Sequence, residues 1–395
     1  MTQLLSTSRA PRVIALDGLR GLAALVVVFH HLSLTLPSIS NYYLHPESIG
    51  VESGSPTWWL TATPVHLLIA GPEAVIVFFV ISGAALTMPT LRNRSFDWFA
   101  YVPQRLVRLY VPAVAAVLLA VVLILATPQD PSAAGSGWLA SATFADPTIS
   151  AVVNTLDILF GAPQLNNVLW SLRWEIVFSL SLAVFVGVAS VVVGASRLLL
   201  ATAVSILAIA LGYVVHVEAF FYLPVFFLGA IVAVNLDAIR AYGQRLSPTR
   251  SFVLGGAVIV ASLLLMSTYV MLTNVLPLQS PLVDAARALV PLGGLGLVIS
   301  ALAFSGFARL LSTPPIRWLG RVSFSLYLVH VPIIVAVNAL LGPGHALILI
   351  VVSFVAALVM AELFARLVEL PMHRWSKWVG TRFAQRRLAA PTVEG

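Results

Sequence analysis

The chain consists of long apolar runs separated by short polar segments. A run of about 20 apolar residues is long enough to cross a bilayer as a helix. Ten runs fit this description and predict an all-α polytopic membrane protein with about ten transmembrane helices. The predicted spans are Val13–Leu36, Val65–Met88, Pro103–Ala126, Val168–Val193, Leu198–Val215, Ala219–Leu236, Phe252–Thr273, Asp284–Phe304, Ser323–Leu341 and Ala346–Val368.

The positions of lysine and arginine predict how these helices are oriented. With the N-terminus in the cytoplasm, all but two of the 22 basic residues fall in cytoplasmic segments or at the adjoining helix ends. Such an excess is typical of cytoplasmic loops. We therefore expect a multi-pass protein of the plasma membrane with both termini cytoplasmic. The exceptions, Arg173 and Arg287, lie near the outer ends of the fourth and eighth spans.

The composition excludes several other classes of protein. Hydrophobic residues make up 59% of the chain and charged residues 9%, whereas a soluble domain has about 25% charged residues. The net charge of +7 follows from topology and from contact with anionic lipid, so it does not indicate nucleic-acid binding. The chain has no cysteine, which excludes disulfides, thiolate metal sites and a cysteine acyl carrier. We predict no metal site.

Two units are expected along the chain. Residues 1–368 are predicted to form the membrane domain, with the first apolar run retained as a span and not cleaved as a signal peptide. Residues 369–395 are predicted to form a basic cytoplasmic tail. Two outer segments are longer than turns: Pro37–Pro64 contains Tyr42, Tyr43, Trp58 and Trp59, and Thr127–Asn167 contains proline, glycine and serine with Trp138. They either anchor the chain at the membrane interface or form a partial lid over an outer cavity.

The first span carries ionisable residues, which are costly inside a membrane and suggest a functional site. Arg20 and His31 are eleven residues apart, so they share a helix face with an offset of about 20° and a separation of roughly 16 Å along the axis. Asp17 lies near the same stripe, and His30 lies well off it. The alternative is an arginine that extends to the membrane surface and a histidine that bonds a neighbouring helix.

Other candidate residues lie in the third and fourth spans. Arg105 and Arg108 are three residues apart and share a face, which suits the capture of phosphate oxygens; the alternative is anchoring at the cytoplasmic surface. In the fourth span Glu175 lies below Trp170, at the depth predicted for His31. A carboxylate there would orient the histidine or stabilise its imidazolium form. A structural ion pair between Glu175 and Arg173 is the competing interpretation.

The remaining candidates are supporting residues. Glu73 lies at the outer end of the second span, where it is either functional or simply hydrated. Ser82 permits close helix packing in the same span. In the ninth span Tyr327 and His330 share a face, and His330 either takes a direct part or is a hydrogen-bonding strut. Asp284 and Arg287, which are also three residues apart, are interpreted as a structural pair.

Taken together, these segments resemble the acyltransferase-3 family of membrane acyltransferases, which modify hydroxyl groups of envelope carbohydrates and some small molecules. The resemblance covers nearly the whole chain. Its motifs, in the family's order, are LDGLRGLAALVVVFHH, FFVISG, RLVR, LWSLRWE and SLYLVH. Some family members carry a fused SGNH-type esterase domain, which this chain lacks, so a relay of that kind needs a separate partner outside the cell.

The resemblance assigns roles to particular residues. The family signature of an arginine, ten residues and a histidine selects Arg20 and His31. The family's paired arginines correspond to Arg105 and Arg108, and its carboxylate in the fourth span corresponds to Glu175. Two further positions, Tyr327 and His330, match the family's ninth span. Many members have two adjacent glutamates in the fourth span, whereas here Ile176 follows Glu175.

We expect an O-acyltransferase that uses cytoplasmic acyl-CoA, with acetyl-CoA the favoured donor, and no permanently bound cofactor. The CoA phosphates would bind Arg105, Arg108 and Arg20. The pantetheine arm would thread between the helices toward His31, the general base, with Glu175 as its orienting partner. The acceptor would be a hydroxyl of an envelope carbohydrate or a glycosylated small molecule.

Two other functions fit part of the pattern. In a proton-coupled secondary transporter of a small polar solute or glycoside, His31, Glu175 and Arg173 would form the substrate site. The sequence shows no paired halves with broken helices, which disfavours this alternative. A membrane scaffold or sensor without catalytic activity would tolerate neutral replacements of Arg20 and His31.

Overall fold

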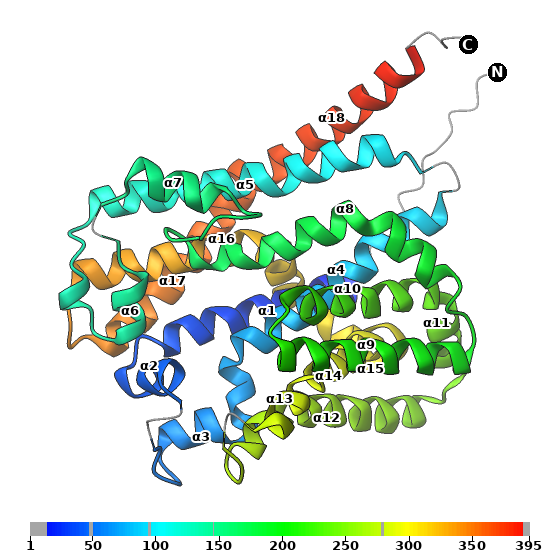
Figure 1. The fold of residues 1–395 in the computed structure, drawn as a ribbon, viewed down its shortest axis with the longest axis horizontal. Helices are drawn as coiled ribbons and strands as arrows, with labels where there is room; N and C mark the ends of the chain where they lie inside the picture. Colours follow the sequence, from blue (N-terminus) through cyan, green and yellow to red (C-terminus); the bar gives the residue numbers. More distant parts are fainter. Residues whose placement is uncertain (1–13, 47–49, 94–95, 145, 278–279, 390–395) are drawn as a thin grey trace.

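The computed structural model describes residues 14–46, 50–93, 96–144, 146–277 and 280–389. All regular elements in these residues are helices (Figure 1). Nine helices among them are long and apolar enough to cross a membrane. Their bounds are Ile14–Ser33 (α1), Gly71–Arg92 (α4), Trp98–Ala126 (α5), Asn167–Ser190 (η3 and α8), Ala195–Val215 (α9), Pro248–Leu272 (α12), Pro281–Ala303 (α13 and α14), Pro314–Leu341 (α16) and Ala346–Gln385 (α17, η4 and most of α18).

The sixth predicted span is the bent part of the bundle. Its apolar run forms α10 (Glu218–Val234), which continues into α11 (Leu236–Arg245) after a bend of 61°. Counted as one span, this pair brings the total to ten within the described residues. The prediction of about ten membrane-length helices is therefore confirmed.

Short helices connect the long ones. They are α2 (Pro37–Leu44), α3 (Pro56–Ala62), η1 (Pro64–Ile69), η2 (Pro131–Ala133), α6 (Gly137–Ala142), α7 (Ile149–Leu156), η3 (Asn167–Leu169) and α15 (Ser305–Leu311). The compound spans divide into α8 (Trp170–Ser190), α13 (Pro281–Arg287), α14 (Val290–Ala303), α17 (Ala346–Phe364), η4 (Ala365–Glu369) and α18 (Leu370–Ala389).

Three helices begin at places that the apolar pattern does not indicate. The second span starts at Gly71 and not at Val65, because residues 64–69 form a 3₁₀ turn and Pro72 supplies the fixed φ of a first helical turn. The third starts at Trp98, five residues before Pro103, because the side chain of Asp97 caps it. The ninth starts at Pro314, well before Ser323.

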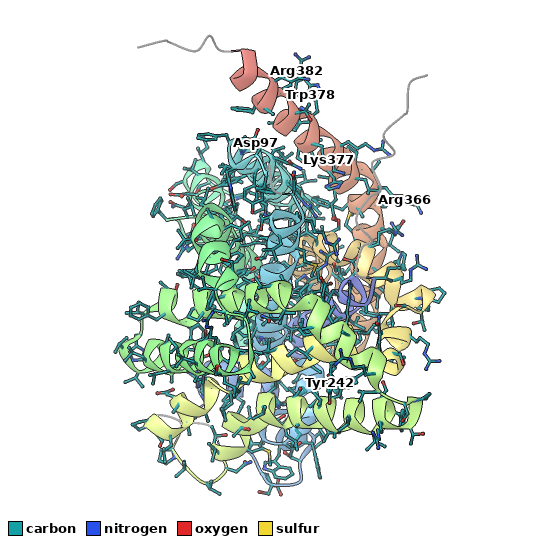
Figure 2. The ribbon with its side chains drawn as sticks, turned by 90° about the vertical axis from the view of Figure 1, so that its right-hand side faces the viewer. Asp97, Tyr242, Arg366, Lys377, Trp378 and Arg382 are labelled. Atoms are coloured by element: carbon teal, nitrogen blue, oxygen red, sulfur yellow. The ribbon has the colours of Figure 1, made fainter. Side chains whose placement is uncertain are left out.

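The last span does not end near Val368. It passes through the π-helical turn η4 into α18, so the first part of the predicted tail is helical, while residues 390–395 lie outside the described residues. α18 runs beside α5 and extends past the bundle (Figure 1). Figure 2 shows Lys377, Trp378 and Arg382 on this projecting part, where the Arg382 guanidinium lies 5.0 Å from the centre of the Trp378 ring.

The core places α1 between α4 and α16. The α1–α16 crossing depends on two glycines, since a β-carbon on Gly21 would lie 2.4 Å from the backbone nitrogen of Gly320. A β-carbon on Gly320 would lie 2.3 Å from the carbonyl oxygen of Asp17. This close approach, typical of membrane helices, brings the side chain of Arg20 against α16. Ser82 is followed by Gly83, which makes a similar approach to α10 at Phe226.

Candidate functional site

A cavity of about 690 Å³ lies at the end of α1 that carries His31. Its lining is rich in aromatic side chains, among them Tyr42, Tyr43, Trp138, Trp170 and Tyr222. The first two come from α2 and Trp138 comes from α6, so both long connecting segments cover this cavity. Such a concave, aromatic chamber with a few polar groups is typical of a small-molecule site.

His31 lies in the cavity wall and is half-buried. Its Nδ1 lies 3.0 Å from the carbonyl oxygen of Val27 and 3.0 Å from Nε2 of His330. A carbonyl oxygen only accepts, so we assign the proton of the neutral ring to Nδ1. Nε2 then carries a lone pair and is the nitrogen left for contacts in the cavity, as a general base requires.

His330 determines this arrangement from α16. Its side chain is fully buried, and its Nδ1 lies 3.0 Å from the carbonyl oxygen of Leu326. Nδ1 therefore donates to that carbonyl, and Nε2 of His330 accepts from Nδ1 of His31. The position predicted to be either a direct participant or a strut is thus the hydrogen-bond partner of His31.

Glu175 does not have the predicted role of orienting His31. It forms a hydrogen-bonded ion pair with Arg105 and accepts a longer bond of 3.5 Å from Ser82. The competing prediction of a Glu175–Arg173 pair is also wrong, because Arg173 donates to the loop carbonyl oxygens of Ile158 and Gly161.

The physical reason is the depth at which α8 begins. Asn166, just before this span, is buried and donates a 2.8 Å hydrogen bond to the carbonyl oxygen of Leu328, within α16. The start of α8 therefore lies inside the protein and not at a membrane boundary. Five residues further on, about 7.5 Å along the helix, Glu175 reaches the level of Arg105.

The three predicted arginines converge but are not equivalent. Arg20 donates to the hydroxyl oxygen of Ser323 at 2.9 Å and to the carbonyl oxygen of Gly320 at 3.0 Å. Its guanidinium also lies 3.8 Å from the carboxylate of Asp17. Arg105 is buried and donates to Ser179 at 3.1 Å as well as to Glu175.

Arg108 completes this cluster and is exposed. It lies within electrostatic range of both Arg20 and Arg105. Because Arg105 is neutralised by Glu175, Arg108 is the member of the predicted pair whose charge faces outward. Arg108 is therefore the member of this pair that an anion in solution can reach.

Tyr327 connects the two ends of the site. Its hydroxyl lies 2.8 Å from the hydroxyl of Ser171 and donates to the carbonyl oxygen of Val168 at 3.0 Å. Its ring centre lies 6.1 Å from that of His330. Ser323 lies one turn before Tyr327 on α16 and accepts from Arg20 of α1. Glu175 lies one turn after Ser171 on α8 and accepts from Arg105 of α5. Polar side chains therefore occur at successive turns of α16 and α8 between the histidine pair and the arginines.

The pantetheine arm is expected to thread between the helices from the arginines to His31. In the described part of the chain this route is not open. The cavity lining ends at Val27, Val168 and Tyr327 and includes none of Arg20, Arg105 and Arg108. Phe78 lies edge-on to Tyr327, with ring centres 5.8 Å apart. Packed side chains therefore separate the cavity from the arginine cluster.

Glu73 is also in the cavity wall, and it is buried, not hydrated at the surface. It accepts a hydrogen bond from Tyr269 and lies 4.0 Å from Nε2 of His66. Neither Tyr269 nor His66 is singled out by the sequence pattern. The signal for His66 was weak, since the residue precedes the helix in a run that otherwise looks like part of the span. Asp284 and Arg287 form the predicted pair, 3.7 Å apart.

Comparison with known proteins identifies a family and a relative. Residues 13–366 match the acyltransferase-3 family, described as an acyltransferase domain. The chain is 28% identical over 391 residues to the O-acetyltransferase PaAT-1 of Phomopsis amygdali, an alignment that covers 84% of this chain and 73% of that protein. No solved structure matches the chain.

Proposed function

The chain belongs to the acyltransferase-3 family, and we propose that it transfers an acyl group, with acetyl favoured, from acyl-CoA to a hydroxyl of a saccharide or glycoside. The observation that carries this proposal is the histidine pair. His31 lies in the wall of an aromatic cavity, with its Nδ1 proton held by His330 and its Nε2 left as a base. The relative named an O-acetyltransferase supports acetyl transfer over proton-coupled transport.

We place the arginine cluster at the cytoplasmic side of the plasma membrane and the cavity at the outer side. The distribution of basic residues along the sequence supports this orientation. Acyl-CoA is then taken from the cytoplasm, and the acceptor enters from outside. A separate partner outside the cell would be needed for any later transfer of the acyl group.

The CoA end of the donor would be held by charge, and its thioester end would lie at the base. Arg108, with Arg20 beside it, would bind the CoA phosphates. The thioester would reach His31 after the pantetheine arm covers the ~16 Å that eleven residues of α1 span. Because packed side chains close this route, Tyr327 and Phe78 have to separate for the arm to pass.

The chemistry then needs one base. Nε2 of His31 takes the proton of the acceptor hydroxyl as its oxygen attacks the thioester carbonyl. The C–S bond breaks, the new ester forms, and CoA leaves as a thiol after taking up that proton. His330 stabilises the transient imidazolium of His31 by accepting from its Nδ1. We propose direct transfer without an acyl-enzyme.

Acceptor-dependent release of CoA from acetyl-CoA by the protein in proteoliposomes tests the reaction. Free thiol is measured in the presence and absence of a mixture of glycosides, and mass spectrometry identifies acetylated products. The chain has no cysteine, so CoA is the only source of thiol. Glycoside uptake driven by a proton gradient without acetyl-CoA would instead indicate a transporter.

Replacing Arg108 by alanine is expected to raise the KM for acetyl-CoA about tenfold, because one hydrogen bond to a charged phosphate is lost. The kcat is expected to change little, since Arg108 is remote from His31. Arg317→Ala, an exposed arginine at the start of α16, is the matched control. Equal KM values for Arg108→Ala and Arg317→Ala would show that Arg108 does not bind the donor.

Replacing His330 by alanine is expected to lower kcat about 10- to 100-fold, the range seen when the partner that orients a functional histidine is removed. His330→Gln keeps an acceptor near Nδ1 of His31 and is expected to retain more activity than His330→Ala. The dependence of kcat on pH separates this effect from loss of packing, because only a partner of His31 changes the profile. Equal activities and unchanged profiles for both variants would make His330 a structural residue.

A further inference from the structure

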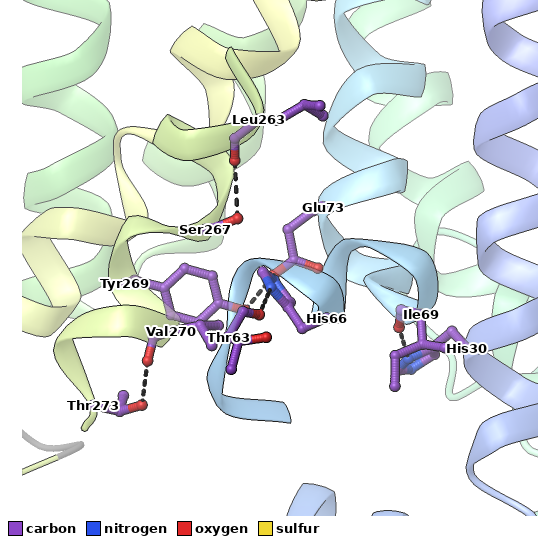
Figure 3. Close-up of polar contacts among 10 residues, drawn as sticks. All are labelled: His30, Thr63, His66, Ile69, Glu73, Leu263, Ser267, Tyr269, Val270 and Thr273. Carbon is purple, nitrogen blue, oxygen red and sulfur yellow. Dashed lines mark hydrogen bonds and ion pairs between the residues drawn. The ribbon is translucent and has the colours of Figure 1, made fainter. Parts of the chain in front are cut away.

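A second polar cluster lies in the cavity wall near the histidine pair. Glu73, at the start of α4, is held through Oε1 by the hydroxyl of Tyr269 from α12. Figure 3 shows this oxygen turned toward Tyr269 and His66, and the other carboxylate oxygen turned toward the side of His30. The ring of His30 in turn lies 5.0 Å from that of His31. The carboxylate of Glu73 therefore faces the part of the cavity that leads to the proposed base.

His66 contributes an unsatisfied hydrogen-bond acceptor to the same cluster. Its Nδ1 lies 3.1 Å from the carbonyl oxygen of Thr63, so Nδ1 carries the proton and Nε2 is an acceptor. The residue is 6% exposed, and Nε2 has no hydrogen-bond partner among the described residues. Burial lowers the pKa of His66 below its ordinary value, while the charge of Glu73 opposes this shift. Two acceptors, Nε2 of His66 and Oε1 of Glu73, thus lie 4.0 Å apart, and only Oε1 has a donor in the described chain, the hydroxyl of Tyr269.

Arg287 lies beside this cluster and is paired with Asp284, whose carboxylate lies 3.7 Å from its Nε. Its guanidinium lies 5.3 Å from the centre of the Tyr269 ring and 5.9 Å from that of Tyr213. The residue lines the cavity, and its buried Nε has no hydrogen-bond partner in the described chain. The wall therefore presents acceptors on Glu73 and His66 and a donor on Arg287.

We propose that Glu73, His66 and Arg287 form the subsite that binds the non-reacting hydroxyls of a neutral saccharide acceptor. This inference rests on the proposed function. A sugar hydroxyl donates to Glu73 or His66 and accepts from Arg287, which gives hydrogen-bond partners to Nε2 of His66 and Nε of Arg287. The aromatic side chains of the cavity cover the apolar faces of the sugar ring. Binding here directs another hydroxyl toward Nε2 of His31.

The same charges select against ionised acceptors. A carboxylate on the sugar would meet the buried charge of Glu73, which disfavours an acidic saccharide. An ammonium group would meet Arg287, which already occupies the faces of the two tyrosine rings. A neutral polyhydroxylated ligand is the class that fits both groups.

Three phenyl glycosides of equal size separate these classes. Phenyl β-glucoside is neutral, phenyl β-glucosaminide is cationic and phenyl β-glucuronide is anionic. Their binding to the full-length protein in detergent is measured by the fluorescence of tryptophan, because Trp138 and Trp170 line the cavity. We expect phenyl glucoside to bind at least tenfold more tightly than either charged probe. Equal binding of all three probes, or no binding of the glucoside, would overturn the proposal.

Glu73→Gln is the main test variant. It keeps the size of the side chain and removes its charge, so we expect binding of the glucoside to weaken about tenfold. We also expect the penalty against the glucuronide to shrink, an effect that a merely structural role does not produce. Glu52→Gln, at an exposed position outside the cavity, is the matched control. Unchanged selectivity in Glu73→Gln would contradict the assignment.

Two replacements of His66 test its unpaired nitrogen. His66→Asn keeps a donor toward Thr63 and removes the acceptor at the position of Nε2. His66→Gln places an amide oxygen near that position. We expect His66→Asn to weaken binding of the glucoside more than His66→Gln, and the reverse order would exclude His66 from the subsite.

Binding and transfer are measured separately, so the two proposals fail in different ways. If glucoside binding depends on Glu73 but no acceptor is acetylated from acetyl-CoA, the subsite is supported and the proposed reaction is refuted. If the wild-type protein transfers acetyl but Glu73→Gln does not change the selectivity among the three glycosides, the reaction is supported and the subsite is refuted.

Discussion

Replacing His31 by alanine is expected to lower kcat for acetyl transfer by about 10² to 10⁴-fold, the usual contribution of a general base. The variant loses the nitrogen that takes the acceptor proton, whereas the cavity and the arginine cluster stay intact. The Nδ1 of His31 contacts His330 and Val27, and its ring packs against His30 and Trp138. Its removal leaves Nε2 of His330 without a donor, at a cost of about 1–3 kcal/mol, so the folded fraction of the variant is measured alongside kcat.

The measurement is the rate of acceptor-dependent CoA release, together with acetyl-CoA binding by the same preparation. Binding is expected to remain near the wild-type value, because Arg20 and Arg108 are unchanged. His345→Ala, an exposed histidine before α17, is the matched control and is expected to keep full activity. A His31→Ala protein that transfers acetyl at the wild-type rate would refute the base assignment.

His31→Gln tests whether residue 31 acts as a base or only forms hydrogen bonds. The glutamine amide is uncharged at every pH and cannot act as a base, although it is polar and of similar length. We expect it to be as inactive as His31→Ala. Activity in His31→Gln would mean that this position only positions the acceptor by hydrogen bonding.

The sequence predicted the helices well because apolar length is a local property. Runs such as Leu198–Val215 and Phe252–Thr273 appear as α9 and α12 with small shifts at their ends. The errors arose where capping decides the boundary. Asp97 starts α5 before the apolar run begins, and the 3₁₀ turn η1 takes up residues that looked like part of a span.

The sequence located residues along one helix better than it paired residues on different helices. Periodicity along one helix placed Arg20 and His31 on the same face, and this needs no knowledge of neighbouring helices. Partners on different helices depend on relative depth, which apolar length does not determine. Glu175 was matched to His31 on the assumption that α8 begins at the membrane boundary. The buried hydrogen bond of Asn166 shows that it begins deeper.

Residues outside the spans were the hardest to place. His66 lies in a short 3₁₀ turn, and its proximity to Glu73 depends on how that turn folds back against α12. His30 was set aside because it lies off the stripe of α1, yet it lines the cavity and its Nδ1 lies 2.8 Å from the carbonyl oxygen of Ile69. A cavity formed by several helices receives side chains from more than one face of each.

Breaking the ion pair between Arg105 and Glu175 is expected to destabilise the protein by about 3 kcal/mol, the lower end of the range for buried pairs. Arg105→Met leaves the carboxylate of Glu175 without its cation in a site where that side chain is 20% exposed. Glu175→Leu leaves the buried guanidinium of Arg105 with only Ser179 as a side-chain partner in the described residues. Each single variant is therefore expected to be clearly less stable than the wild type.

The double variant Arg105→Met/Glu175→Leu tests whether the cost comes from the unpaired charge. Replacing both partners by apolar residues of similar size removes both charges from the interior, and its stability is expected to return near the wild-type value. Unfolding in detergent is followed by tryptophan fluorescence, since the chain has no cysteine for thiol-reactive dyes. A double variant destabilised by the sum of the two single effects would mean that the two side chains contribute independently.

Arg108→Met is the matched control for this stability experiment, because it lies on the same helix three residues from Arg105 and is exposed. Its stability is expected to stay within about 0.5 kcal/mol of the wild type, although its KM for acetyl-CoA rises. The double variant keeps Arg108 and is expected to fold stably with an unchanged KM for acetyl-CoA. Of the two arginines on α5, Arg105 would thus stabilise the helix bundle and Arg108 would bind the donor. Loss of acetyl-CoA binding in the stable double variant would show instead that Arg105 contacts the donor directly.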